Sequence, residues 1–171
     1  MATSCLENYT LQGIKMDCNP LLAGIKRLWL TYYDDVTVTP DFDAHQVSAV
    51  TLSSGVTWYK YDFARDTSSL TSTLTKDDSN GTRYYTNTIT VVFNKLEAKK
   101  HLEVMALAAE KLAAVVEDMN NKKWFVGYDG YISASASETT TGASSDDRNG
   151  YNVTLDGTSA YLPFEFTGTI E

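Results

Sequence analysis

Apolar residues recur at helical spacing in one long segment of this chain. Between Leu96 and about Met119, intervals of three and four residues predict one amphipathic helix over about residues 96–119. The apolar positions of this pattern are Leu102, Met105, Ala106, Ala109, Leu112, Val115, Val116 and Met119. Nearly every other segment is rich in Thr, Ser, Tyr, Val and Gly, which indicates strands and turns. A β-rich chain with one helix predicts an α+β fold in which the helix covers a sheet face.

Several segments show the period of two that is typical of strands. Residues 25–33 carry apolar side chains on both faces, which predicts a central strand. Residues 47–52 and 56–63 flank Ser53-Ser54-Gly55 and predict a hairpin. Further strands are predicted over residues 124–128, 131–137, 150–155 and 160–167.

The longest predicted hairpin spans about residues 66–90. Its two arms flank a polar turn that contains Asn80-Gly81, a strong hairpin signal. The hairpin is polar toward its tip and apolar only at its base. Because such a hairpin cannot bury its own faces, it is usually an arm that meets a partner or is mobile. The polar segment 138–149 is predicted to be either a loop or the tip of another long hairpin.

Length and charge narrow the function classes. The chain has 171 residues, which favours one domain over residues 1–171, with residues 1–22 as a candidate N-terminal arm. The net charge of −8 argues against a nucleic-acid-binding surface but fits a surface past which nucleic acid slides. The first residues lack the features of a signal peptide, and no apolar run approaches the roughly 20 residues of a membrane span. We therefore expect synthesis in the cytoplasm and no membrane span.

No catalytic or metal-binding constellation emerges from the spacing of the reactive residues. The two histidines, His45 and His101, are far apart in the sequence, and paired aspartates lie in predicted turns. Cys5 and Cys18 lack the further Cys or His ligands of a zinc site, so free thiols are favoured and a disulfide between them stays open. We expect a protein that is not an enzyme and that binds no cofactor and no metal.

The order of the elements resembles that of a known family. After the strand IKRLWL come the aromatic strand TWYKYDF, the polar hairpin, the helix, WFVGYDGYIS, DDRNGYNVTLDG and the closing strand YLPFEF. Over about residues 22–168 this order resembles the tail-tube-like proteins of tailed bacteriophages. NNKKWFVGYDG and TGASSDDRNGYNVTLDG are similar to segments of small virion proteins of phages that infect Bacteroidetes, including crAss-like phages.

The resemblance implies a mainly antiparallel β-sandwich or partly closed barrel flanked by the helix. It also implies a structural subunit of the virion tail, six copies of which form a ring of a tail tube or a tail or neck ring. DNA would pass through the lumen during ejection without specific binding. Partners would be further copies of the chain and other phage tail or neck proteins. Tail-terminator, neck-ring and baseplate proteins share the fold, so these roles and the ring stoichiometry stay open.

Contacts between subunits are expected on the two long polar segments. The polar hairpin is the candidate inter-subunit arm, and the polar segment after residue 138 supplies three further positions. The expected contact residues are Thr67, Leu70, Leu74, Asp77, Asp78, Asn80, Arg83, Tyr85, Asp146, Asp147 and Arg148.

The alternative interpretation is a β-sandwich module that binds carbohydrate or protein through aromatic side chains and loops. Strand packing and interface anchoring explain the same aromatic residues, because aromatic side chains favour both. The residues that could line a sugar-binding face are Trp58, Tyr59, Tyr61, Tyr84, Tyr85 and Trp124.

Overall fold

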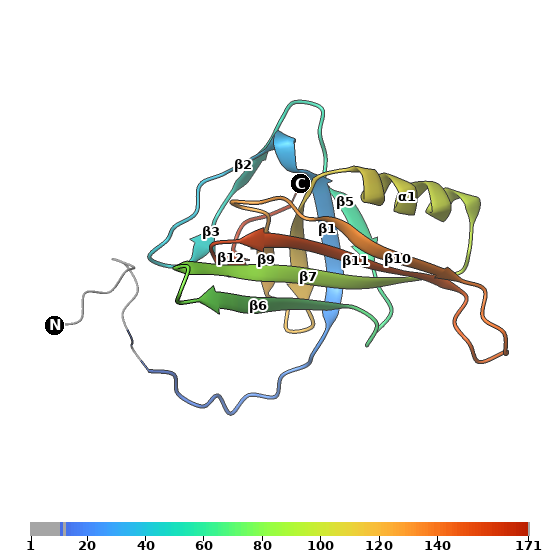
Figure 1. Ribbon diagram of the computed structural model, residues 1–171, viewed down its shortest axis with the longest axis horizontal. Coiled ribbons are helices and arrows are strands. Elements are labelled where there is room, and N and C mark those ends of the chain that lie inside the picture. Colours follow the sequence, from blue (N-terminus) through green and yellow to red (C-terminus); the bar gives the residue numbers. More distant parts are fainter. Residues whose placement is uncertain (1–10, 12, 171) are drawn as a thin grey trace.

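Two β-sheets whose strands cross form the body of the protein (Figure 1). The structure is a computed structural model that describes residue 11 and residues 13–170. The larger sheet has six strands, antiparallel except for the pair β3–β12. Its order is β3 (Gln46–Val47), β12 (Phe164–Phe166), β9 (Lys123–Val126), β8 (Leu112–Asp118), β1 (Ile25–Tyr32) and β5 (Tyr59–Asp62).

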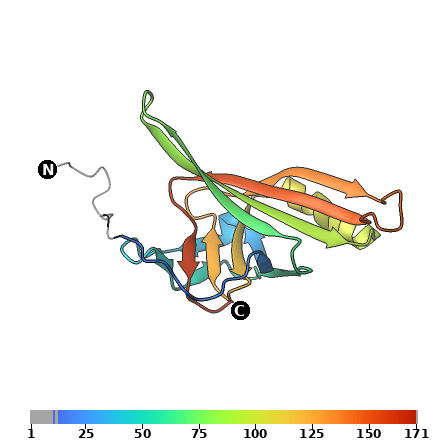
Figure 2. The same ribbon diagram turned by 90° about the horizontal axis from the view of Figure 1, so that it is seen from below.

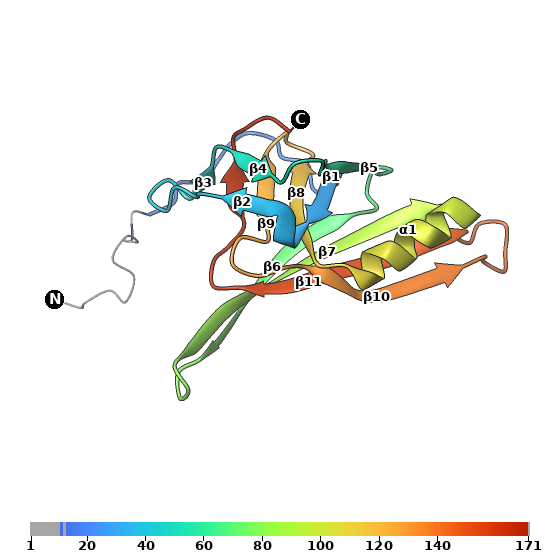
Figure 3. The same cartoon turned by 90° about the horizontal axis from the view of Figure 1, so that it is seen from above.

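The second large sheet has four antiparallel strands, and one helix lies on the side that faces the six-stranded sheet (Figure 3). Its order is β10 (Ser133–Thr140), β11 (Gly150–Ser159), β7 (Thr82–Asn94) and β6 (Ser69–Asp77). The remaining elements are the helix α1 (Ala98–Ala109), the short 3-10 helix η1 (Tyr33–Asp35), and the paired strands β2 (Val36–Val38) and β4 (Val50–Leu52). The structure confirms the predicted α+β fold, which is mainly antiparallel and sandwich-like, with one α-helix in the described chain. The sheets do not close into a barrel.

The two sheets differ in how many of their faces are buried. Alternate side chains of β7 and β11 point toward the six-stranded sheet and form the main core with it and with one stripe of α1. This core includes Leu28, Leu30, Ile89, Val91, Val104, Leu107, Ala114, Val116, Val153 and Leu155. A second core on the other face of the six-stranded sheet includes Val47, Val115, Phe125, Phe164 and Phe166. The six-stranded sheet is therefore buried on both faces, and the four-stranded sheet on one.

The helix is shorter than its sequence pattern predicts. It ends at Ala109, and Leu112–Asp118 form strand β8 between β1 and β9. Residues 112–117 are all buried, so this strand has no polar face that would reveal a period of two. A short apolar run of this kind fits helical spacing and a buried strand equally well. The prediction of a helix over 96–119 is correct for its first half and wrong for its second half.

The hairpin predicted from residues 47–52 and 56–63 does not form. Instead β4 pairs with β2, β5 pairs with β1, and Val47 lies in β3. Pairing with β1 places Tyr61 opposite Leu28, which is fully buried in the main core. Cross-strand contacts of this kind stabilise a sheet, and a local turn at Gly55 would not provide them. The hairpin predicted over about 66–90 is confirmed as β6–β7, with Ser69 opposite Thr90 and Asp77 opposite Thr82.

The N-terminal segment leaves the body of the protein (Figure 1). Residues 13–22 form no helix or strand, and Leu11, Ile14 and Met16 expose at least 93% of their surface. Cys18 is an exposed free thiol. The rest of the candidate arm, including Cys5, lies outside the described residues.

Candidate assembly interface

The four-stranded sheet ends in two strands that have no neighbour on their outer side. Within the described residues β6 pairs only with β7, and β10 pairs only with β11. The two edges are similar in length, with nine residues in β6 and eight in β10. Residues 73–76 and 135–139 are exposed, so neither edge is covered. Free edges of this length expose rows of unpaired backbone N–H and C=O groups that can pair with another chain.

The face of the four-stranded sheet that points away from the core is mostly polar. Its charged strand residues are Asp77, Glu138 and Asp156, and no described strand position on this face is Lys or Arg. Threonines oppose one another across the strands in a regular array: Thr71 with Thr88, Thr73 with Thr86, Thr90 with Thr154, and Thr86 with Thr158. We call this surface the threonine face. It is an extended, weakly acidic sheet surface without cations.

Eight of the predicted contact residues lie on or beside hairpin β6–β7. Thr67 donates a hydrogen bond to the carbonyl oxygen of Ala64 at 2.6 Å, and Leu70 packs against the main core. These two residues therefore support the base of the hairpin. The other six lie toward the tip, which extends beyond the rest of the molecule (Figures 2 and 3). They are Leu74, Asp77, Asp78, Asn80, Arg83 and Tyr85.

Asp77 organises the tip of this hairpin. Its carboxylate accepts hydrogen bonds from the backbone N–H groups of Ser79 and Asn80 and from both of their side chains. These bonds, led by the one from the Ser79 hydroxyl, hold the pKa of Asp77 below its usual value of 3.8. The Asp77 carboxylate is thus occupied by its own turn, as expected for Asp in an Asx-type turn. Asp78 forms an ion pair with Lys76 at 2.6 Å.

We expect the tip of the hairpin to loosen in acid. A group whose pKa is lowered in the folded state stabilises it above the unfolded-state pKa and loses that effect as the pH falls through the lowered value. The amide resonances of Ser79 and Asn80 should therefore shift, and exchange faster, below about pH 4. A pH titration followed by amide NMR measures this, with Asp77→Asn as the variant whose turn amides should no longer titrate. Unchanged Ser79 and Asn80 resonances down to about pH 2 would contradict the assignment.

The other three predicted contact residues lie at the opposite end of the four-stranded sheet (Figure 1). Asp146, Asp147 and Arg148 are in the loop between β10 and β11, and β11 begins opposite the last residue of β7, whereas the β6–β7 tip adjoins its first residue. At about 3.4 Å per residue, this loop is roughly 40 Å from the β6–β7 tip along β7. Apart from Thr67 and Leu70 at the hairpin base, the predicted contact residues therefore form two separate patches at the two ends of one sheet.

The 141–149 loop has its own internal bonding. The carboxylate of Asp147 accepts hydrogen bonds from the backbone N–H groups of Ala143 and Ser144 at 2.8 and 2.7 Å. These bonds hold the pKa of Asp147 below its usual range. Asp146 and Arg148 are exposed and form no ion pair with a described residue. The loop is the tip of a second hairpin, β10–β11, which is one of the two outcomes that the sequence left open.

The histidines lie in different parts of the fold. His45 stacks on Phe164 with ring centroids 4.3 Å apart, and its Nε2 is 3.1 Å from the carbonyl oxygen of Leu162. His101 lies on α1, edge-on to Tyr151. Within residue 11 and residues 13–170, no three His, Cys, Asp or Glu side chains are grouped so that they could hold a metal ion.

The six aromatic residues of the alternative interpretation do not share one face. Tyr61 packs against the main core, Trp58 against the second core, and the Trp124 indole N–H donates to Asp118 at 3.2 Å. Tyr84 and Tyr85, neighbours in β7, point to opposite faces of that strand. Only Tyr59 and Tyr61, two residues apart on one face of β5, border the same hollow.

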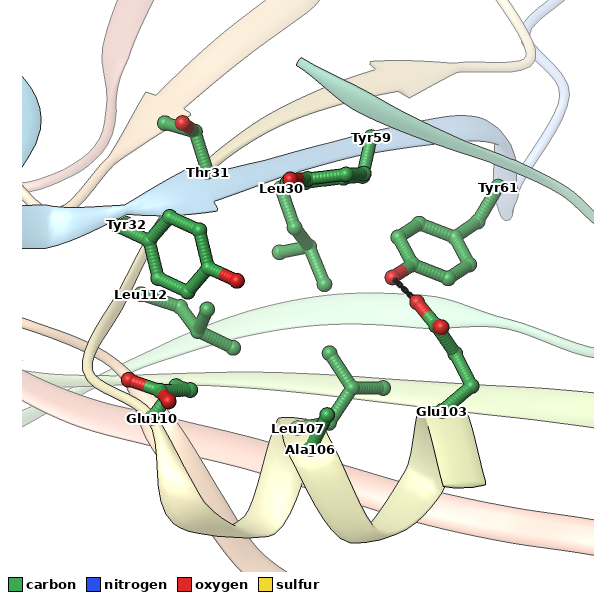
Figure 4. Close-up of a pocket in the computed structure, with 10 residues that line it drawn as sticks. All are labelled: Leu30, Thr31, Tyr32, Tyr59, Tyr61, Glu103, Ala106, Leu107, Glu110 and Leu112. Carbon is green, nitrogen blue, oxygen red and sulfur yellow. Dashed lines mark hydrogen bonds between the residues drawn. The ribbon is translucent and has the colours of Figure 1, made fainter. Parts of the chain in front are cut away.

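That hollow is a pocket between α1 and strands β1 and β5 (Figure 4). Alternate residues of the paired strands, Leu30 and Tyr32 on β1 and Tyr59 and Tyr61 on β5, point toward the helix. The rings of Tyr32 and Tyr59 meet edge-on with centroids 6.1 Å apart. The pocket also includes Thr31, Glu103, Ala106, Leu107, Glu110 and Leu112. The sequence pattern did not predict this pocket, because the residues that line it come from distant segments. The one signal was that Tyr59 and Tyr61 lie on the same face of a strand.

No helix in the described part of the chain is long and apolar enough to cross a membrane. Comparisons with protein-family models, with curated proteins and with solved structures find no match to this chain.

Proposed function

We propose that this protein is a structural subunit of a phage tail, and that six copies form a ring of a tail tube or of a tail or neck ring through which DNA passes. The proposal rests on the resemblance of the sequence pattern and on one structural observation. That observation is the pair of free, similarly long edges, β6 and β10, on the two sides of one antiparallel sheet. A subunit with two different, complementary edges assembles head to tail. Such an assembly closes into a ring when the rotation from each subunit to the next adds up to one full turn.

The directions of the two edges suit this assembly. Each strand of the sheet is antiparallel to the next, so β6 and β10 run in opposite directions within one subunit. Rotation about a ring axis leaves strand directions unchanged relative to that axis. Pairing of β6 in one copy with β10 in the next would therefore continue the antiparallel pattern without interruption.

The offset between the two edges supports a tilted barrel. β6 is centred on Thr73, opposite Thr86 of β7, whereas β10 is centred near Ser137, which aligns through Val153 with Val91 of β7. The offset from residue 86 to residue 91 corresponds to about 17 Å along β7, and the four strands together are about 19 Å wide, measured perpendicular to the strands. If the edges pair along their full length, these two lengths give a strand tilt of about 42°, and closed barrels have tilts of about 35–45°.

The threonine face fits the lining of a channel. Apart from the distal part of hairpin β6–β7, the opposite face of the same sheet is covered by the six-stranded sheet and α1, so the threonine face is the one that can point into a ring closed through β6 and β10. Six copies of the four-stranded sheet would give roughly 24 strands, more than the roughly 16–18 with which porins enclose an aqueous channel. Polar uncharged side chains with a few carboxylates and no cations give DNA phosphates no attachment point.

The first test is the mass and shape of the purified protein across a range of concentrations. We expect light scattering to give a mass near six copies, and negative-stain microscopy to show rings or stacked tubes with an open centre. A strict monomer at every concentration would contradict self-assembly. Saturable binding of a glycan by that monomer would favour the alternative binding module.

A further inference from the structure

The pocket between α1 and strands β1 and β5 has a carboxylate at each end. Glu103 lies on α1, and Glu110 is the residue that directly follows the helix; seven residues at the helical rise place them about 10 Å apart along its axis. Figure 4 shows Glu110 beside Tyr32 at one end of the pocket and Glu103 beside Tyr61 at the other. The pocket is therefore a slot with two negative ends.

Neither carboxylate meets a cation of the described chain inside the slot, although Glu103 shares a second hollow with Lys60, Lys99 and Lys100. Glu103 and Glu110 form no ion pair with a described residue, and no Lys or Arg lines the slot. The Tyr61 hydroxyl donates a 2.5 Å hydrogen bond to Glu103 Oε1, which fixes that carboxylate at the slot. Burial, followed by the Glu103 carboxylate, raises the pKa of Tyr61. The pKa of Tyr32 is raised mainly by Tyr59 and, to a smaller extent, by Glu110 and Glu103. The phenols thus stay neutral, and the negative potential comes from the two carboxylates.

The middle of the slot is apolar. Leu30, Leu107 and Leu112 are at most 5% exposed and form its floor, and the tyrosine rings form its wall (Figure 4). The cavity measures about 120 Å³ and is open to solvent on one side. A closed cavity of about 150 Å³ holds benzene, which has six heavy atoms, so this slot can hold a chain of four or five methylene groups.

We propose that this slot binds a linear aliphatic diamine in its doubly protonated form. One ammonium group pairs with Glu103 and the other with Glu110, and the methylene chain lies on the leucine floor against the tyrosine rings. The face of an aromatic ring attracts an ammonium group, and aromatic walls are a known means of holding alkylammonium ions. A monoamine would leave one carboxylate without a partner, and a neutral diol would leave both.

This site is separate from the proposed channel and its contacts. No residue of β6 or β10 lines the slot, and α1 covers the core side of the four-stranded sheet, opposite the threonine face. Loss of diamine binding and loss of ring formation are therefore independent outcomes.

The test is a calorimetric titration of the full-length protein with 1,4-diaminobutane and 1,5-diaminopentane at constant ionic strength. Butylamine and 1,4-butanediol are the matched ligands with one charge and none. We expect saturable one-to-one binding of the diamines, at least about fivefold weaker binding of butylamine, and none of the diol. Methyl NMR resonances of Leu107 and Leu112 should shift during the diamine titration, which places the ligand in the slot.

Two variants and one control decide the assignment. Glu103→Gln and Glu110→Gln keep the shape of each side chain, and the glutamine oxygen at 103 still accepts the Tyr61 hydrogen bond. We expect each to weaken diamine binding at least about fivefold, whereas Glu138→Gln, on the threonine face, should leave it within about twofold. Equal weakening by all three variants would show diffuse attraction to an acidic protein and overturn the proposal. Absence of saturable diamine binding, or binding of the diol as strongly as the diamine, would also overturn it.

Discussion

Removal of the distal half of hairpin β6–β7 should abolish ring formation while the subunit stays folded. The change deletes residues 74–85 and joins Thr73 to Thr86 through Asn-Gly, because these two threonines face each other in register and a two-residue Asn-Gly loop suits such a pair. The deleted part is polar and largely exposed, whereas Leu70 and Ile89, which contact the main core, remain. Half of the β6 edge is lost, and with it half of the backbone groups available to β10 of the next copy.

Two measurements separate assembly from folding in this experiment. Light scattering should give the mass of a monomer, and the thermal midpoint should change by no more than about 4 °C, because no core side chain is removed. The control replaces Leu74 and Tyr84 by serine at full strand length, which keeps the edge backbone and removes two exposed apolar side chains. We expect this control to form rings. If the shortened protein still forms rings and tubes, the β6 edge does not join the subunits.

Local sequence signals predicted the β6–β7 hairpin well because everything that specifies it is local. Asn80-Gly81 lies in the turn of residues 78–81, where Gly81 has a positive φ, and alternation in both arms fixes the register from Ser69–Thr90 to Asp77–Thr82. β1 was also predicted correctly, because apolar residues on both of its faces indicate an internal strand. Where an element carries its own turn and its own alternation, the sequence alone is sufficient.

The errors arose where distant segments decide the structure. β8 is buried on both faces by β1, β9 and the two cores, so its period of two has no polar phase to reveal it. β5 left its predicted local partner because β1 offers Leu28 and Leu30 as cross-strand neighbours. For the same reason the slot between α1 and β5 was missed: Tyr32, Tyr59 and Glu103 come together only after three separate segments pack. The predicted contact residues were placed on two long polar segments, and that the tips of these segments lie at opposite ends of one sheet depends on the topology.

A carboxylate at position 115 should unfold the protein. Val115 is fully buried in β8, opposite Trp29 on one side and Phe125 on the other, within the second core. An uncompensated buried carboxylate costs several kcal/mol, and we expect Val115→Asp to lose at least about 4 kcal/mol of the roughly 5–15 kcal/mol that stabilises a domain. Val115→Ala, which removes two methyl groups, should lose about 2 kcal/mol. Urea unfolding followed by tryptophan fluorescence and far-UV circular dichroism measures both values.

The matched control places the same carboxylate on the four-stranded sheet. Thr75 is exposed on the threonine face of β6, so Thr75→Asp should change the free energy of unfolding by no more than about 0.5 kcal/mol. The contrast tests the physical difference between the two sheets: one is buried on both faces, and the other has a face that belongs to neither core. A folded, stable Val115→Asp protein would place residues 112–118 outside the core. A Thr75→Asp protein as unstable as Val115→Asp would mean that the threonine face is buried within the subunit, and it could not then line a channel.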